Sequence, residues 1–257
     1  MRRVLPLLGL LAVLAAGCGD GQTTTTSPTG TAPTTTTATT TTATGTTALL
    51  VYFLEDGRVR PVARDLPKTR GVAAAALNEL AAGPTKVEER DLQLTSEVDA
   101  GFGGVSVAGG VAHVEDTAGL STPGLAQAVY TLTQFPTVKA VEIDGKRYSR
   151  ADFEDETPII LVESPLPFQH VKSPLRATGT ANTFEATFNY DLTDPDGKII
   201  ATHFVTATSG SGTRGTFDFT VPFTVDRSGL GELIVYELSA ANGQRIHINE
   251  IPVYLEK

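Results

Sequence analysis

Cys18 carries the only thiol in this chain of 257 residues. A single cysteine cannot form a disulfide within the chain, and it cannot build a zinc site that needs two or more thiolates. It follows an apolar run, residues 4–16, and directly succeeds the small residues Ala15, Ala16 and Gly17. This position indicates a thiol at a processing site near the N-terminus.

The second pattern with chemical meaning is G-x-G-x-x-G at residues 210–215. In a dinucleotide site this pattern follows a strand and opens a helix, whose N-terminus faces the pyrophosphate. Here it is followed by the sequence TFDFTVPF, which alternates like a strand. We therefore expect a loop between two strands and no nucleotide site.

The histidines do not form a metal-binding pattern. No two of them have the i, i+4 spacing of a helical ligand pair, and neither H-E-x-x-H nor G-x-S-x-G occurs in the sequence. We expect surface or strand-edge positions for all four, which are His113, His170, His203 and His247.

Carboxylates are frequent, but they fall in turns and linkers, at Glu88-Glu89, at Asp91 and at residues 154–156. Such positions favour solvated charges over a general acid/base pair. The Asp194–Gly197 segment lacks the further ligands of an EF-hand calcium loop. The sequence thus predicts no catalytic, cofactor-binding or metal-binding residue, no cofactor and no enzymatic activity.

The N-terminus has the layout of a secretory leader. Arg2 and Arg3 form a positive start, and the apolar run of residues 4–16 is too short to span a bilayer as a helix. The segment LAAGC resembles the bacterial lipoprotein box, although Ala15 stands where leucine is usual. The resemblance implies a signal peptide over residues 1–17 and a diacylglyceryl anchor on Cys18 that holds the protein at the extracytoplasmic face of the cell membrane. A plain secretory signal with a chance cysteine is the alternative.

A threonine-rich segment follows the cysteine. Of the 26 residues from Gln22 to Thr47, 17 are threonine and none is charged. Such a composition buries too little apolar surface to fold, so residues 18–47 are expected to form a disordered tether. Its r.m.s. span would be on the order of 28 Å. A plain spacer and an O-glycosylated stalk both fit this composition.

Residues 48–154 read as an α+β domain, with a small sheet and two helices on one of its faces. Asp56-Gly57 and Gly109-Gly110 mark tight hairpin turns between alternating segments. The first helix buries Ala73, Ala76, Leu77 and Leu80 and ends at Gly83-Pro84. For the second helix, which buries Leu125, Ala128, Val129 and Leu132, the pattern predicts Thr122 as N-cap and Pro123 as the first helical residue.

Two phrases in this region resemble the GerMN domain of sporulation and germination lipoproteins. They are LNELAAGPT at residues 77–85 and YTLTQFPTVKAVEIDG at residues 130–145. The resemblance covers most of residues 49–148. It implies contacts between proteins and no known chemistry.

Residues 157–257 read as an immunoglobulin-like β-sandwich that follows a polar, acidic linker at residues 150–158. About seven short alternating strands are separated by turn signals, among them Asp194–Gly197 and Asn242-Gly243. The segments at residues 162–197, 214–223 and 237–243 resemble the Gmad2 domain, an immunoglobulin-like module that accompanies GerMN.

The formal net charge of −9 argues against a nucleic-acid partner, because an acidic body is repelled by phosphates. Together these features predict a non-enzymatic, lipid-anchored protein of the cell envelope that presents two protein-interaction modules. It would be linked to sporulation, to germination or to assembly at the cell wall, with an envelope protein as partner. The alternative is a module that binds peptidoglycan or another carbohydrate.

Overall fold

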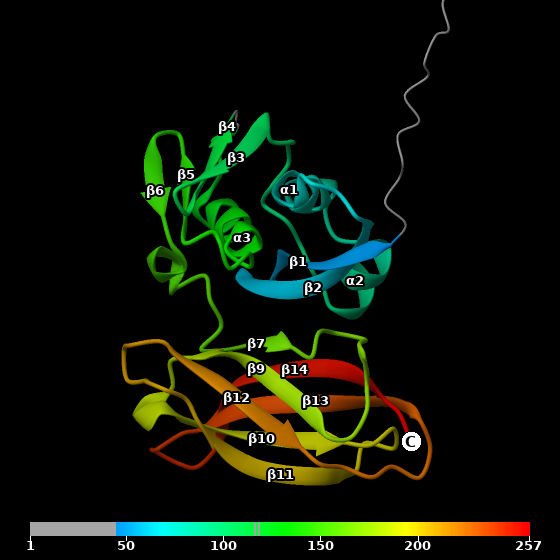
Figure 1. Ribbon diagram of the computed structural model, residues 1–257. Helices are drawn as coiled ribbons and strands as arrows, with labels where there is room; N and C mark the ends of the chain where they lie inside the picture. The colour runs from blue at the N-terminus through cyan, green and yellow to red at the C-terminus, as the bar shows by residue number, and fades with distance from the viewer. Residues whose placement is uncertain (1–44, 116, 118) are drawn as a thin grey trace, which may run out of the picture. The chain divides into compact units, whose positions relative to one another are not determined.

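The structure is a computed structural model, and it describes residues 45–115, 117 and 119–257 (Figure 1). Among the described residues, no helix is long and apolar enough to cross a membrane. We call residues 45–153 the N-terminal part and residues 159–257 the C-terminal part.

The N-terminal part alternates strands and helices. Its elements are β1 (Thr46–Glu55), β2 (Arg58–Pro67), α1 (Val72–Ala82), α2 (Lys86–Asp91), β3 (Gly104–Ala108), β4 (Val111–Glu115), α3 (Thr122–Leu132), β5 (Ala140–Ile143), β6 (Lys146–Tyr148) and the 3-10 helix η1 (Arg150–Phe153).

The predicted α+β class is confirmed, with the strands divided between two sheets. Strands β1 and β2 form a hairpin, and the second sheet has the order β3-β4-β5-β6. Its central pair β4–β5 is parallel, because α3 lies between these strands in the chain. Helices α1 and α3 pack against each other and against β1, and Figure 1 shows them between the hairpin and the four-stranded sheet.

Two-residue turns close the hairpins where the sequence predicted them. Asp56 and Gly57 have φ values of 49° and 76°, and Gly109 and Gly110 have values of 56° and 84°. Positive φ at both central residues is the geometry of the type I′ turn, which matches the twist of the flanking strands.

The helix ends differ in part from the prediction. Helix α1 ends at Ala82 as expected, but α3 has Ser121 as its N-cap, with the Ser121 hydroxyl accepting the Gly124 N–H at 3.2 Å. Thr122, the predicted cap, is the first helical residue. Either hydroxyl satisfies the cap preference, so the sequence alone does not decide between these neighbouring residues. The short helix α2, capped by Thr85, was not predicted.

Side chains of α3 and of Gln134, which follows the helix, bind the free backbone edge of β1. Thr131 accepts the Tyr52 N–H at 3.1 Å, and Gln127 donates to the Tyr52 carbonyl at 3.1 Å. The amide of Gln134 accepts the Leu50 N–H at 2.7 Å and donates to the Leu50 carbonyl. These bonds satisfy backbone groups that a further strand would otherwise pair.

The C-terminal part consists of strands joined by short turns. They are β7 (Ile160–Ser164), β8 (His170–Val171), β9 (Leu175–Ala181), β10 (Thr187–Thr193), β11 (Ile199–Thr206), β12 (Gly215–Val221), β13 (Gly229–Leu238) and β14 (Arg245–Leu255), with the 3-10 helix η2 (Phe184–Ala186) before β10.

The predicted immunoglobulin-like sandwich is confirmed. One sheet has the order β11-β10-β13-β14-β8, and the other has the order β12-β9-β7. The core between them holds Phe188, Leu192, Phe217, Leu233 and Val253, all buried. Inward aromatic and aliphatic side chains therefore fill the space between the sheets.

The two predicted turns of this part differ in outcome. Asp194–Gly197 forms the expected turn, in which the Gly197 N–H donates to the Asp194 carbonyl at 3.0 Å. Asn242-Gly243 lies within a longer loop, because the strand pairing ends at Leu238 and Arg245. The Asn242 side chain accepts the Gln244 N–H at 3.0 Å and shapes that loop.

Strand β7 contributes to both hydrophobic cores. Ile160 and Val162 face the core of the sandwich, whereas Leu161 is buried with the core residues of the N-terminal part. Alternation along a strand sends neighbouring side chains to opposite faces. Since both faces of β7 are buried, the strand links the two cores.

Candidate functional site

Cys18, the only site residue that the sequence predicted, lies outside the described residues, as do the predicted signal peptide and most of the tether. The lipid anchor therefore stays a prediction. The histidines, the carboxylates and the glycine pattern named in the sequence analysis lie among the described residues.

The G-x-G-x-x-G segment is a loop followed by β12, as expected. Its glycines allow close backbone contacts. A Cβ on Gly210 would lie 2.4 Å from the Thr183 carbonyl oxygen, and one on Gly215 would lie 2.3 Å from the Ser209 nitrogen. The pattern therefore reflects packing of one loop against its neighbours.

All four histidines lie in strands and are exposed or half-buried, and none is part of a metal cluster among the described residues. His113 lies 3.2 Å from Glu142, and His170 stacks on Tyr254 with ring centroids 4.9 Å apart. His203 accepts the N–H of Phe204, and His247 lies 3.9 Å from Glu237.

Two carboxylates that the sequence assigned to solvent instead have structural roles. Glu88 accepts hydrogen bonds from both terminal nitrogens of Arg64, at 2.6 and 2.8 Å. Glu154 accepts two bonds from Arg214, each of 2.9 Å. The paired N–H donors of an arginine fit the two oxygens of a carboxylate. The sequence did not predict either pair, because the partners are 24 and 60 positions apart.

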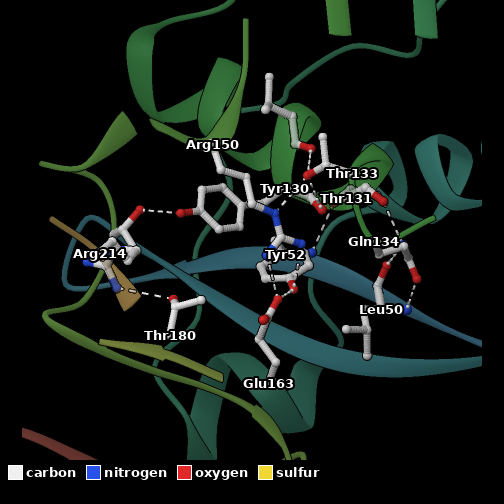
Figure 2. Close-up of polar contacts among 12 residues, drawn as sticks. Leu50, Tyr52, Tyr130, Thr131, Thr133, Gln134, Arg150, Glu163, Thr180 and Arg214 are labelled. Carbon is white, nitrogen blue, oxygen red and sulfur yellow. Dashed lines mark hydrogen bonds and ion pairs between the residues drawn. The ribbon is translucent and has the colours of Figure 1, made fainter. Parts of the chain in front are cut away.

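Figure 2 shows the most extensive partly buried polar cluster that we find among the described residues, where β1, η1 and β7 meet. The Tyr52 hydroxyl donates to the Glu163 carboxylate. Arg150 binds the same carboxylate at 2.7 Å, and it also donates to the Thr133 hydroxyl at 2.8 Å. The Arg150 guanidinium lies 4.6 Å from the centroid of the Tyr130 ring. We call these five residues the junction cluster.

Burial determines the protonation of the junction cluster. It raises the pKa of Tyr52 well above its ordinary value, and the Glu163 charge raises it further. Burial also opposes the charge of Arg150, but the charge of Glu163 and its hydrogen bond favour the cation, and the pKa of Arg150 is raised. Tyr52 therefore remains a neutral donor and Arg150 a cation, which suits a fixed structural contact.

A second contact joins the two parts at Arg60 of β2, whose side chain is only 3% exposed. The guanidinium donates to the side chain of Asn249 and to the carbonyl of Glu250, both on β14, and it lies 3.0 Å from Glu55. In addition, the Val59 N–H donates to the Glu156 carbonyl at 2.8 Å. A buried arginine with this many acceptors fixes the spacing of the elements that supply them.

The predicted linker takes part in the same contacts. Phe153 and Thr157 are buried, and the Thr157 hydroxyl lies 2.7 Å from that of Tyr130. Arg214 donates to the Pro158 carbonyl at 2.9 Å. Residues 150–158, which the sequence predicted as a polar linker, thus include buried side chains and contact both parts.

The C-terminal part also has an open groove of about 540 Å³ lined by hydroxyls and carboxylates. The polar residues that line it are Glu163, Thr178, Thr180, Thr206, Thr208, Thr216 and Asp218. Such a surface can donate and accept hydrogen bonds at several points.

What the sequence missed at these sites is the partner of each charge. Arg150 stood in the expected linker and Arg214 in the glycine-rich loop. Their carboxylate partners lie 13 positions away for Arg150 and 60 positions away for Arg214. The one available signal was the frequency of arginine in segments that are otherwise apolar, as at Arg60 and Arg64 of β2.

Comparison with family models gives two matches. Residues 50–149 match the Germane family, described as "Sporulation and spore germination". Residues 159–244 match the Gmad2 family, described as "Immunoglobulin-like domain of bacterial spore germination". The two matches lie where the sequence resemblances were found.

Comparison with solved structures gives a match titled "The crystal structure of CopC from Methylosinus trichosporium OB3b". The identity is 14%, the match covers 38% of this chain and 93% of that chain, and the TM-score is 0.26. With so low a TM-score and identity, we conclude nothing about fold or function from this match. No curated protein matches the chain.

Proposed function

We propose that this chain, which matches a Germane domain followed by a Gmad2 domain, is a non-enzymatic envelope protein. It is lipid-anchored at Cys18, and it presents both domains as one binding unit. The observation that carries this proposal is the buried contact between the domains. Leu161, Arg60 and the junction cluster each bring residues of one domain into the interior of the other.

A fixed contact between the domains has a direct consequence for binding. Two surfaces held in one arrangement meet a partner without a further loss of orientational freedom, which improves affinity. The arginine–carboxylate pairs and the neutral Tyr52 described above fit a structural role and provide no nucleophile or general base. Both family descriptions name spore germination and no reaction, which supports an interaction module linked to sporulation or germination.

The lipid anchor is tested directly at Cys18. Cells that express the full chain are fed an alkyne-tagged fatty acid, and the Cys18→Ser variant is the control. We expect label and membrane association in the native chain and their loss in the variant. Because the chain has no other cysteine, equal labelling of the two proteins, or equal release by washing without detergent, would refute the anchor.

The binding role is tested by cross-linking the full chain in its native envelope. We expect a specific envelope protein to be captured, and its capture to fall when the domain contact is broken by Arg60→Ala. A chain with exposed Lys86→Ala serves as the matched surface control. Intact cells that yield no cross-linked partner would contradict the proposal.

A second candidate function, binding of peptidoglycan or another carbohydrate, is favoured by the hydroxyl-lined groove. Sugar hydroxyls are both donors and acceptors, as threonine hydroxyls are. Sedimentation of the full chain with purified cell wall separates the two functions. Retention that is lost in a Thr178→Val, Thr216→Val double variant favours the carbohydrate, and a chain that stays in the supernatant excludes it.

A further inference from the structure

A cleft of about 390 Å³ lies beside the contact that Arg60 makes between the two parts. The β1–β2 hairpin of the N-terminal part lines it with charged residues, and strand β14 lines it from the C-terminal part. Among the lining residues are Glu55, Asp56, Arg58, Asn249 and Glu250. We call this space the junction cleft. Because both parts line it, its shape depends on the contact between them.

Glu55 connects the buried arginine with the junction cleft. Its carboxylate lies 3.0 Å from the Arg60 guanidinium, and its side chain is 38% exposed, whereas that of Arg60 is 3% exposed. Arg60 also has two neutral acceptors, the side chain of Asn249 and the backbone carbonyl of Glu250. A proton from solvent can therefore reach Glu55 through the cleft, and Arg60 keeps hydrogen-bond acceptors when Glu55 is neutral.

The charges around Glu55 are of both signs. Arg60 favours its ionised form, and Arg58 is a second cation that lines the cleft. Asp56, the next residue in the chain, and Glu250, from the other part, both oppose its charge. Like charges in a partly enclosed space repel one another more strongly than in bulk water. Of these acidic groups, Glu250 is brought to Glu55 by the contact between the parts.

The neighbouring elements carry further titratable groups. Burial raises the pKa of Glu232 on β13, and the charge of Glu250 raises it further. Glu156 of the predicted linker bonds β2 through its backbone carbonyl. His247 of β14 lies 3.9 Å from Glu237 on β13. The contact between the parts thus brings acidic groups of β13 and β14 toward the acidic end of the β1–β2 hairpin.

These surroundings make the two protonation states of Glu55 differ in their effect on the contact. Burial raises the pKa of Glu55, and the charges of Asp56 and Glu250 add to this effect, so that together they outweigh Arg60. Separating the parts would remove Glu250 and the cover from β14, and the pKa would return toward its ordinary value. A carboxyl whose pKa is higher in the joined state binds a proton more readily there. The contact therefore gains stability as the pH falls through the raised pKa, and the full gain is present below the ordinary value.

We propose that the contact between the two parts is pH-sensitive, and that it tightens when Glu55 takes up a proton. The neutral carboxyl still offers an oxygen to Arg60, while its repulsion by Asp56 and Glu250 is removed. The ionised carboxylate restores the repulsion and loosens the contact. This inference goes beyond the proposed function, because it depends neither on the lipid anchor nor on an envelope partner, and each can fail while the other holds.

The test follows the hydrogen exchange of single backbone amides in the full chain by NMR, between about pH 7.5 and about pH 5, corrected for the intrinsic effect of pH on exchange. The reporter is Val59, whose N–H donates to the Glu156 carbonyl at 2.8 Å. The reference is Leu54, whose N–H donates to the Thr95 carbonyl within the N-terminal part at 2.9 Å. The ratio of their protection factors separates the contact between the parts from unfolding of the N-terminal part.

We expect this ratio to rise about threefold or more in the native chain as the pH falls over this range. Glu55→Gln imitates the neutral carboxyl, so its ratio should be high at the upper end of the range and change little with pH. Glu89→Gln, which alters an exposed pair on α2, is the matched control and should rise as the native chain does. Arg60→Ala breaks the contact and should lower the ratio at every pH.

Each of three results would overturn the proposal. They are a native ratio that stays constant or falls with decreasing pH, a Glu55→Gln variant that keeps the full rise, and equal ratios in the native and Arg60→Ala chains. Should Arg60→Ala fail to fold, the native chain and Glu55→Gln still decide the question.

Discussion

The hydroxyl of Thr131 accepts the backbone N–H of Tyr52 at 3.1 Å, so a helix side chain occupies the position that a neighbouring strand would otherwise take. The two residues are 79 positions apart, and both are buried. The bond holds β1 against α3 at the point where Tyr52 begins the junction cluster. It therefore links the edge of one strand to the contact between the two domains.

Replacing Thr131 with valine keeps the shape of the side chain and removes the acceptor. The Tyr52 N–H would then be buried without a partner, at a cost of about 1–3 kcal/mol. We expect the free energy of unfolding, measured in urea, to fall by this amount. Thr220→Val, at an exposed position, is the control, and equal midpoints for the two variants would contradict the role assigned to Thr131.

Replacing Arg150 with alanine leaves Glu163 without its cation. Since both side chains are partly solvated, we expect a loss of about 2 kcal/mol, which is below the roughly 3–5 kcal/mol for a fully buried pair. The comparison is Arg176→Ala, which breaks the exposed pair with Asp218 and should leave the urea midpoint within error. A similar loss from both variants would show that burial does not govern the junction cluster.

Leu161 packs into the core of the N-terminal part from strand β7 of the C-terminal part. Leu161→Ala removes this contact, and we expect a loss of about 2–5 kcal/mol. Because each domain has a core of its own, the single calorimetric transition expected for the native chain should separate into two. One transition that merely moves to lower temperature would argue that the domains depend on other contacts.

Gly179 lies in β9 opposite Val162 of the neighbouring strand β7, next to a register shift in their pairing. A Cβ there would lie 2.0 Å from the Leu161 carbonyl oxygen and 2.7 Å from the Phe217 ring. We expect Gly179→Ala to destabilise the chain by about 3 kcal/mol, because two strands and a core ring must move. Gly101→Ala, which meets no atom within 4 Å, is the matched control. Circular dichroism during heating distinguishes the two.

Glu88 should make stability depend on acid pH. Burial opposes its charge, but the bonds from Arg64 and from the Thr85 N–H outweigh burial, so the pKa of Glu88 is lowered. A lowered pKa in the folded state stabilises the fold above the unfolded value of about 4.3, and this contribution is lost as the pH falls through the folded pKa.

We expect Glu88→Gln to cost about 1 kcal/mol at pH 7 and the difference from the native chain to shrink below about pH 4. Urea titrations at several pH values measure this. Glu89→Gln, which breaks the pair with the exposed Lys86, should differ little at any pH. A Glu88→Gln deficit that stays constant down to pH 3 would exclude the linkage.

The sequence alone determined the local features of this protein. Asp56-Gly57 and Gly109-Gly110 specified their turns, because these residues accept the positive φ that a tight hairpin needs. The spacing of Ala76, Leu77 and Leu80 placed the buried face of α1, and strand alternation identified the sandwich. These properties depend on neighbours within about one helical turn or one hairpin, so a single chain displays them.

Only the tertiary structure decided which polar residues are structural and which surfaces remain open. In the sequence, Arg60, Arg150 and Glu154 cannot be distinguished from solvated charges. Their partners are identified only in the tertiary structure, where distant segments meet. The junction cleft likewise depends on tertiary contacts, because Glu55 and Glu250 come from strands that are far apart in the sequence. Burial and pairing are set by chain segments far apart in sequence, and composition does not record which segments meet.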